Sequence, residues 1–313
     1  MPARGEPMKI LVSGSNGFIG SALVPFLSSN GHDVRRLVRS SGRAPEGQPI
    51  WDPQGGKIDP GGLEGFDGVV HLAGENIATG RWNAAKKARI RDSRVDGTRL
   101  LCEAVARLAQ PPKILICASA IGYYGDRSDE LLSEQSAPGS GFLATVCREW
   151  EAATEAAARK QIRVVNLRIG VVLSPSGGAL SRMLTPFRMG VGGKIGSGQQ
   201  YMSWIAIDDI VGAILHALVH ENLSGPINAV SPNAVTNLEF TRALGSVLRR
   251  PTVFPMPAMA ARIAFGEMAD ALLLSSTRVE PKRLLASGYT FRHPTLEGAL
   301  RHLLGKSASS SAA

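Results

Sequence analysis

The sequence predicts an α/β protein in which helices cover both faces of a parallel β-sheet. Apolar runs alternate with helical patterns along most of the chain, as in successive βαβ units. Each predicted strand is almost entirely apolar, as expected for strands buried on both faces. The first of them ends in a glycine run that opens a helix. With 313 residues, the chain has room for one large domain or for a core with a smaller second lobe.

The elements follow in order from the apolar pattern. Strands are predicted at residues 9–14, 32–39, 67–74, 113–120, 162–173 and 225–230. Helices are predicted at residues 20–31, 89–112, 147–161 and 210–222. Residues 174–209 are rich in glycine and weakly periodic, which favours a substrate-facing loop region.

The same pattern predicts the domain boundaries. The sheet domain covers residues 8–230 and includes the loop of about 174–209. Short helices with proline punctuation predict a small, mainly helical C-terminal domain at 237–304. The low-complexity tail 305–313 is predicted to be disordered.

The run Gly14-x-x-Gly17-x-x-Gly20 lies between a strand and a helix, which is the context that a dinucleotide-binding turn requires. Gly14 permits the tight turn, Gly17 lets the backbone approach a pyrophosphate, and Gly20 lets the helix pack close to the strand. The helix amides then face the phosphates. A doubly wound Rossmann sheet is therefore predicted; the alternative is a glycine-rich turn that holds no ligand.

The second strand indicates which dinucleotide binds. An NAD site usually has an acidic residue at the end of this strand, but here the strand ends in Arg39, and Asp33 lies at its beginning. A guanidinium group suits the 2′-phosphate of NADP. NADP(H) is therefore favoured over NAD(H), and the alternative is that Arg39 is a solvated charge.

Longer motifs give a more specific resemblance. These are "HLAGENIATGRW", "SRVDGTRLL", "SAIGYYG", "LRIGVVLSPSGGAL", "PFRMGVGGKIGSGQQYMSWIAIDD" and "RLLASGYTFRHPTLEGAL". With the glycine run, they resemble the extended and atypical short-chain dehydrogenase/reductases, in particular the nucleoside-diphosphate-sugar-epimerase-like subfamily with its small C-terminal domain. The resemblance covers roughly residues 8–304. It implies a Rossmann core that binds NADP(H) and an oxidoreductase or epimerase-like activity on a small molecule.

The resemblance also implies which residues line the cofactor. They are Gly14, Asn16, Gly17, Phe18, Ile19 and Gly20 in the turn, Arg39 beyond it, and Leu72, Ala73 and Gly74 at the end of the third predicted strand. Glu75 and Arg81 follow near the cofactor or the substrate, and the alternative for these two is a surface ion pair.

The catalytic motif of the family is missing. An ordinary member has Tyr-x-x-x-Lys on a helix, with a serine upstream, and the lysine lowers the pKa of the tyrosine so that the phenol can transfer a proton. The register here puts Leu143 and Cys147 at the tyrosine and lysine positions. Ala120 takes the place of the serine, and Ser119 precedes it.

Three interpretations stay open. The first is an enzyme with another acid/base, for which the candidates are Tyr123, Tyr124, Ser119 and Glu75; the alternative for Tyr124 is a packing role. The second is a protein that binds NADPH without turnover, as a redox sensor or to dock a partner. The third is a structural or interaction protein with a vestigial site.

The later loop favours an anionic small-molecule substrate. Its candidate substrate residues are Arg182, Arg188, Lys194 and Gln199, which offer cations and an amide. The alternative is a solvated basic loop. Asp208 and Asp209 are expected to cap the helix that follows them, and no residue at metal-ligand spacing joins them.

Composition excludes other classes. The net charge of +9 is scattered in short clusters, which does not indicate nucleic-acid binding. The three cysteines lack metal or disulfide spacing and are predicted to be buried apolar residues, and the histidines form no metal-like or triad-like spacing. His71 is expected to serve packing. No apolar run reaches the roughly 18 residues that a membrane span requires. The short apolar run near the N-terminus soon meets glycines and fits a strand better than a signal peptide, so a cytoplasmic protein is expected.

Overall fold

The computed structural model describes residues 6–39 and 48–306. The chain forms two compact units, each built from three separate segments. Unit 1 consists of residues 1–123, 144–168 and 211–227, and unit 2 consists of residues 124–143, 169–210 and 228–313. Each unit is described below by itself.

Unit 1 is built on a sheet of eight strands in the order β12-β8-β6-β5-β1-β2-β3-β4. The pairs β1–β2, β1–β5, β5–β6 and β2–β3 are parallel, whereas β3 and β4 are antiparallel. The strands are β1 (Lys9–Ser13), β2 (Asp33–Arg39), β3 (Ile50–Asp52), β4 (Lys57–Ile58), β5 (Gly68–His71), β6 (Ile114–Ala120), β8 (Arg163–Ile169) and β12 (Gly225–Ala229). The predicted doubly wound parallel sheet is confirmed.

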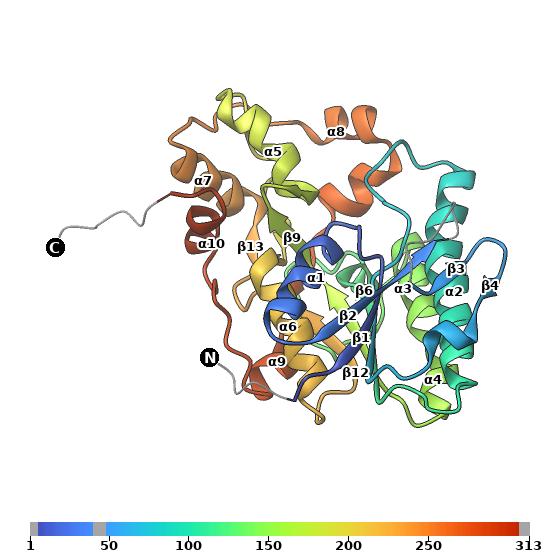
Figure 1. Cartoon of the computed structure of the whole chain (residues 1–313). Helices are drawn as coiled ribbons and strands as arrows, with labels where there is room; N and C mark the ends of the chain where they lie inside the picture. The colour runs from blue at the N-terminus through green and yellow to red at the C-terminus, as the bar shows by residue number, and fades with distance from the viewer. Residues whose placement is uncertain (1–5, 40–47, 307–313) are drawn as a thin grey trace. The chain divides into compact units, whose positions relative to one another are not determined.

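Helices flank this sheet. In Figure 1, α2, α3 and α4 lie on one side of the strands and α1 with α6 on the other. Their bounds are α1 (Gly20–Ser29), α2 (Ala84–Ala106), α3 (Phe142–Ala152), α4 (Glu155–Arg159) and α6 (Ile207–Val219). The long helix begins at Ala84 rather than at the predicted residue 89, because the Asn83 side chain caps it by accepting a hydrogen bond from the Lys86 amide at 2.8 Å.

The strand order reverses direction at β1, because β1 pairs with β2 on one side and with β5 on the other. Such a switch point opens a crevice at the carboxyl ends of the two strands, where open α/β sheets bind ligands. Gly14 follows the last residue of β1, and Leu72 follows the last residue of β5. The Leu72 amide donates to the Ser13 carbonyl at 3.2 Å. The sheet therefore places the glycine turn beside the "LAG" segment.

Unit 2 contains short strands and helices. The strands are β7 (Leu131–Leu132), β9 (Val171–Ser174), β10 (Tyr201–Met202), β11 (Trp204–Ala206), β13 (Val235–Thr236) and β14 (Arg278–Val279). The helices are α5 (Gly178–Arg188), α7 (Asn237–Leu248), α8 (Ala258–Phe265), α9 (Lys282–Ala286) and α10 (Leu296–Leu303). Helix α7 begins with a capping box in which Thr236 and Glu239 exchange hydrogen bonds.

The interpretation of residues 174–209 as loop is wrong for α5. Leu180, Leu184 and Phe187 recur at helical spacing and are buried in a core cluster with Trp204 and Phe240. The helical spacing of these apolar residues is short, and the many glycines around the helix made the whole segment look like loop in the sequence. The sequence-based boundary near residues 230–237 stays a prediction, and residues 307–313 of the predicted disordered tail lie outside the described residues.

The described part of the chain contains no helix whose length and apolar character suffice for a membrane span. Cys102, Cys117 and Cys147 are free and buried, which confirms their prediction as core residues.

Candidate functional site

The glycine turn is shaped by steric demands that differ among its three glycines. Gly14 has φ +68°, and a Cβ there would lie 2.7 Å from the Ala73 nitrogen. A Cβ on Gly20 would lie 2.2 Å from the Gly14 oxygen. A Cβ on Gly17 would meet only that oxygen, at 3.1 Å. The protein's own packing therefore demands Gly14 and Gly20, whereas the close approach of a ligand is the stronger reason for glycine at Gly17.

The first turn of α1 suits an anion. Its N-cap residue is Ile19, whose side chain accepts no hydrogen bond from the first amides. The first amides of a helix have no partners within the helix and carry partial positive charge. The turn and the helix start thus fit the pyrophosphate of a dinucleotide, as the sequence predicts for Gly14 through Gly20.

Two arginines lie on β2 near the turn. Arg39 is exposed at the end of the strand, and Arg36 donates a hydrogen bond from Nη1 to Asn16 Oδ1 at 3.2 Å. Sequence reasoning missed Arg36, although its place three residues before Arg39 in an exposed stretch of the strand was a usable signal. The contact orients the Asn16 side chain, which the sequence predicts to bind the cofactor.

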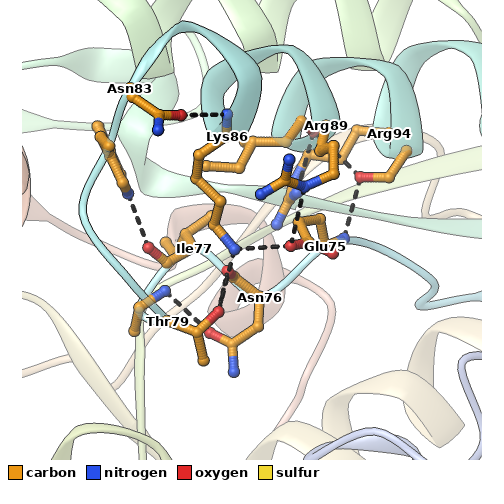
Figure 2. A network of polar contacts seen from close by, with 12 residues as sticks. Glu75, Asn76, Ile77, Thr79, Asn83, Lys86, Arg89 and Arg94 are labelled. Atoms are coloured by element: carbon orange, nitrogen blue, oxygen red, sulfur yellow. Dashed lines mark hydrogen bonds and ion pairs between the residues drawn. The ribbon is translucent and has the colours of Figure 1, made fainter.

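An ion-pair network follows β5. Figure 2 shows Lys86 reaching from the first turn of α2 to Glu75 and Thr79, at 2.6 Å and 3.0 Å from its Nζ. Arg89 lies 3.8 Å from the same carboxylate. The alternative of a Glu75–Arg81 ion pair is wrong, because Lys86 and Arg89 are the partners of Glu75 and Arg81 lies exposed in the loop.

The network changes what Glu75 can do. The hydrogen bond from Lys86 lowers the pKa of the Glu75 carboxyl, with the nearby charge of Arg39 among the smaller causes. Glu75 therefore favours the ionised form and is a weak candidate for a general acid. Sequence reasoning missed Lys86, whose side chain is only 6% exposed. Its signal was its place three residues after the capping residue Asn83.

Ser119 and Tyr123 lie beside a buried ion pair. Ser119 Oγ donates to Glu151 Oε1 at 2.7 Å, and Arg168 Nε donates to the same oxygen at 2.8 Å. The Arg168 guanidinium also stacks on the Tyr123 ring, 3.4 Å from its centroid. The Ser119 hydroxyl thus has a carboxylate acceptor, which competes with the role of a catalytic serine. Sequence reasoning missed the pair because its members come from different elements, α3 and β8.

Tyr124 belongs to unit 2 and is fully buried. Its hydroxyl donates to Asn228 Oδ1 at 2.7 Å, and the backbone amide of Asn228 donates to Glu134 Oε1 at 3.1 Å. This geometry matches the packing alternative for Tyr124.

The positions of the missing motif are apolar. Leu143 and Cys147 both lie on α3. Burial raises the pKa of the Cys147 thiol to about 12, so the side chain is neutral at pH 7. Neither residue can replace the tyrosine or the lysine in proton transfer.

The predicted substrate residues lie in unit 2. Arg182 and Arg188 are both exposed on α5, and their spacing of six residues turns them to different faces of the helix. Lys194 donates from Nζ to the Ser197 carbonyl at 3.2 Å, and the backbone amide of Gln199 donates to Ser197 Oγ at 3.2 Å. The structure brings Lys194 and Gln199 together around one turn, and the substrate role of all four stays a prediction.

The two aspartates at the start of α6 do not cap that helix. The buried Asp209 carboxylate accepts hydrogen bonds from the amides of Arg292 and His293, at 2.7 Å and 3.0 Å. Asp208 pairs instead with His302, at 3.1 Å from its Nε2. The expectation of a helix cap is wrong, because the hydrogen-bond partners of both carboxylates lie in the C-terminal segment. The C-terminal segment also brings His293 close to Asp208 and His302. The atoms of these three side chains that could bind a metal ion lie within 4.8 Å of one another.

His71 is a core residue, as expected. It is fully buried, and its two ring nitrogens bond to Ser13 Oγ at 2.6 Å and Thr98 Oγ1 at 3.0 Å.

A Rossmann sheet with this glycine turn, continued by a second unit, defines the class of atypical short-chain dehydrogenase/reductase-like proteins. The chain belongs to the NAD-dependent epimerase/dehydratase family, whose model matches residues 10–229. A domain of unknown function, DUF1731, matches residues 256–303.

Individual relatives agree with this assignment. The epimerase family protein Mb2239 of Mycobacterium bovis is 46% identical over 293 residues, which cover 93% of this chain and 96% of that protein. The crystal structure of human epimerase family protein SDR39U1 with NADPH has a TM-score of 0.87 at 36% identity, covering 95% of this chain and 99% of that one. The nucleoside-diphosphate sugar epimerase of Corynebacterium glutamicum has a TM-score of 0.79 at 39% identity, covering 96% of this chain and 58% of that one.

Proposed function

We propose that this chain is an NADP(H)-binding oxidoreductase or epimerase-like enzyme that acts on a small anionic molecule without the usual Tyr-x-x-x-Lys motif. The observation that carries the proposal is the glycine turn, in which Gly17 is open to a ligand and α1 has no side-chain cap. The human relative that was solved with NADPH supports the choice of cofactor. The enzyme is proposed to work in the cytoplasm, without nucleic acid or membrane.

The preference for NADP(H) over NAD(H) is assigned to Arg39. A nicotinamide dinucleotide supplies hydride chemistry when it is bound. The glycine turn would hold its pyrophosphate, and Arg39 would hold the 2′-phosphate of its adenosine. A guanidinium adds charge-assisted hydrogen bonds to the 2′-phosphate, worth about 1.5–3 kcal/mol, or roughly ten- to a hundredfold in affinity.

A paired titration with NADPH and NADH, followed by nicotinamide fluorescence, tests this proposal. NADPH is expected to bind at least about tenfold more tightly than NADH. Arg39→Ala is expected to remove the difference. Arg35→Ala, an exposed arginine on the same strand that pairs with Asp33 at 3.4 Å, is the matched control. Equal, weak binding of both cofactors, or an unchanged preference in Arg39→Ala, would refute the proposal.

Of the four catalytic candidates, we retain Tyr123 as the acid/base, because the carboxyl of Glu75 favours the ionised form. Its side chain is half-buried, whereas Ser119 and Tyr124 are buried and donate to Glu151 and Asn228. Tyr123→Phe should leave NADPH affinity unchanged and abolish turnover in a panel of carbonyl and sugar-nucleotide substrates. Turnover that survives this substitution would remove Tyr123 from the role.

The engaged hydroxyls of Ser119 and Tyr124 also favour a second candidate, a protein that binds NADPH without turnover and reports redox state or docks a partner. This candidate predicts that no substrate in the panel oxidises bound NADPH above background. It also predicts a partner that is retained in pull-down only when NADPH is present.

A further inference from the structure

Arg94 presents its guanidinium group to the residues that follow β5. A Cβ built on Gly74 would lie 3.4 Å from Arg94 Cζ and 3.5 Å from each of its two terminal nitrogens. On another side, the guanidinium carbon lies 5.1 Å from the centroid of the Trp150 ring. Arg94 Nη1 donates to the Ile90 carbonyl at 3.1 Å. The group is thus held in place over Gly74, which the sequence predicts to lie along the cofactor.

The charge of Arg94 is not balanced. Among residues 6–39 and 48–306, no carboxylate lies within 4.0 Å of its guanidinium, and Ile90 is its one hydrogen-bond acceptor. The neighbouring carboxylate of Glu75 is engaged by Lys86 and Arg89. Burial lowers the pKa of the Arg94 guanidinium, although an arginine stays charged at any ordinary pH. The end of β5 therefore carries one carboxylate against three cations, and most N–H donors of Arg94 remain available.

Arg94 also lies near the position where the family lysine is missing. Cys147 holds that position on α3. Burial is the main influence on its thiol, and the charge of Arg94 acts on it as well. Because the Cys147 side chain is neutral, it neither repels a bound anion nor competes with one for the guanidinium. A cation from α2 is therefore present beside the place from which the lysine of α3 is absent.

We propose that Arg94 binds the carboxylate of the substrate at the end of β5. This inference rests on the proposed function, since the carboxylate belongs to the substrate of the proposed enzyme. A guanidinium is a planar fork of donors that matches a carboxylate in two parallel hydrogen bonds. The packing of Arg94 against Trp150 and Gly74 fixes the plane of this fork. The phosphates of the cofactor are assigned to the glycine turn and to Arg39, so the anion that Arg94 binds comes from the other ligand.

Calorimetric titration of the NADPH-saturated protein with acetate tests the proposal, with acetamide as the uncharged probe of the same shape. Acetate is expected to bind with a dissociation constant in the millimolar range and acetamide at least about tenfold more weakly. Arg94→Lys, which keeps the charge and loses the fork, should weaken acetate several-fold. Arg94→Met should weaken it at least about thirtyfold. Arg99→Met is the matched control, because Arg99 is exposed on the same helix and pairs with Asp96.

Three results would overturn the proposal: equal binding of acetate and acetamide, wild-type acetate affinity in Arg94→Met, or a loss of NADPH affinity in Arg94→Met as large as the loss of acetate affinity. The last result would assign Arg94 to the cofactor instead. Should Arg94→Met fail to fold, Arg94→Lys carries the comparison. Wild-type protein without NADPH is titrated in parallel. If NADPH does not bind, the proposed function fails, whereas acetate binding to this sample that depends on Arg94 still supports the anion site.

Discussion

Replacing Glu151 with glutamine removes the charge from a deeply buried ion pair in unit 1. The side chain of Arg168 is 3% exposed and that of Glu151 is 13% exposed. The carboxylate accepts hydrogen bonds from Arg168 Nε and Nη2, both at 2.8 Å, and from Ser119 Oγ at 2.7 Å. Glutamine keeps the shape of the side chain, but it replaces one acceptor oxygen with an amino group that faces other donors, and it removes the negative charge of Glu151 from the guanidinium.

Removing one partner of a buried pair costs about 3–5 kcal/mol. Because Glu151 keeps some exposure and glutamine keeps one acceptor oxygen, we expect a loss of about 3 kcal/mol in the free energy of unfolding. At about 2–3 °C per kcal/mol for a protein of this size, the Tm falls by about 6–9 °C. Thermal unfolding followed by circular dichroism measures the change.

The double variant Glu151→Leu with Arg168→Met is the control. Replacing both charges by apolar groups of similar volume removes the guanidinium together with the carboxylate, so this variant should regain most of the lost stability. Ser119→Ala alone should cost about 1 kcal/mol, because it removes one hydrogen bond to the carboxylate. A Tm of Glu151→Gln within 1 °C of the wild type, or a double variant less stable than the single one, would refute the reasoning; the 1 °C limit is roughly the resolution of a shift worth about 0.5 kcal/mol.

Other parts of the molecule give further predictions. Burial lowers the pKa of His71 from 6.5 to about 4, so on acidification the unfolded chain is protonated at this residue at a higher pH than the folded protein. The contribution of His71 to the free energy of unfolding is therefore complete above pH 6.5 and falls by up to about 1.4 kcal/mol per pH unit down to pH 4. Urea unfolding of His71→Gln should lack this pH dependence. An equal slope in the variant and the wild type would contradict a lowered pKa of His71. Gly20→Ala should lower the Tm by several degrees, since its Cβ would lie 2.2 Å from the Gly14 carbonyl oxygen. Gly17→Ala, whose Cβ would lie 3.1 Å from the same oxygen, should lower the Tm less and lose NADPH binding; equal Tm shifts would contradict this difference between the two glycines. Asp209→Asn should cost about 2 kcal/mol in urea unfolding and speed proteolysis within residues 289–293, because the buried carboxylate accepts two backbone amides there; unchanged cleavage would argue against this anchoring.

The core of the sheet could be predicted from the sequence because its signals are local. The strand β5 is buried at all four positions, and β6 is buried at six of its seven, so each appears as a continuous apolar run. The glycine turn could be predicted for the same reason, since its three glycines and the flanking strand and helix are adjacent in the chain. Helix α5 was missed because only three of its residues face the core while glycines surround it.

The polar contacts of the candidate site could not be predicted, because they join residues that are distant in sequence. Glu151 and Arg168 lie on a helix and a strand whose facing sides depend on tertiary packing. Arg94 reads in the sequence as one more charge on a basic helix, and its contact with Gly74 appears only in three dimensions. Sequence alone could show that the usual catalytic residues are absent, but it could not show which charged side chains lie near the positions of the missing tyrosine and lysine.

The division of the chain into units has a consequence for biosynthesis. The backbone passes from one unit to the other at five places, the first between Tyr123 and Tyr124 and the last between Ile227 and Asn228. As the chain leaves the ribosome, residues 124–143 emerge before the partners that they need in unit 2, because β7 pairs with β14 at Arg278–Val279. Loop-closure entropy makes such distant pairings slow to form. The last segment of unit 1 ends at Ile227, so unit 1 can fold before the C-terminal residues of unit 2 have been synthesised. A chain that stops before β14 would leave β7 in residues 124–143 without its strand partner.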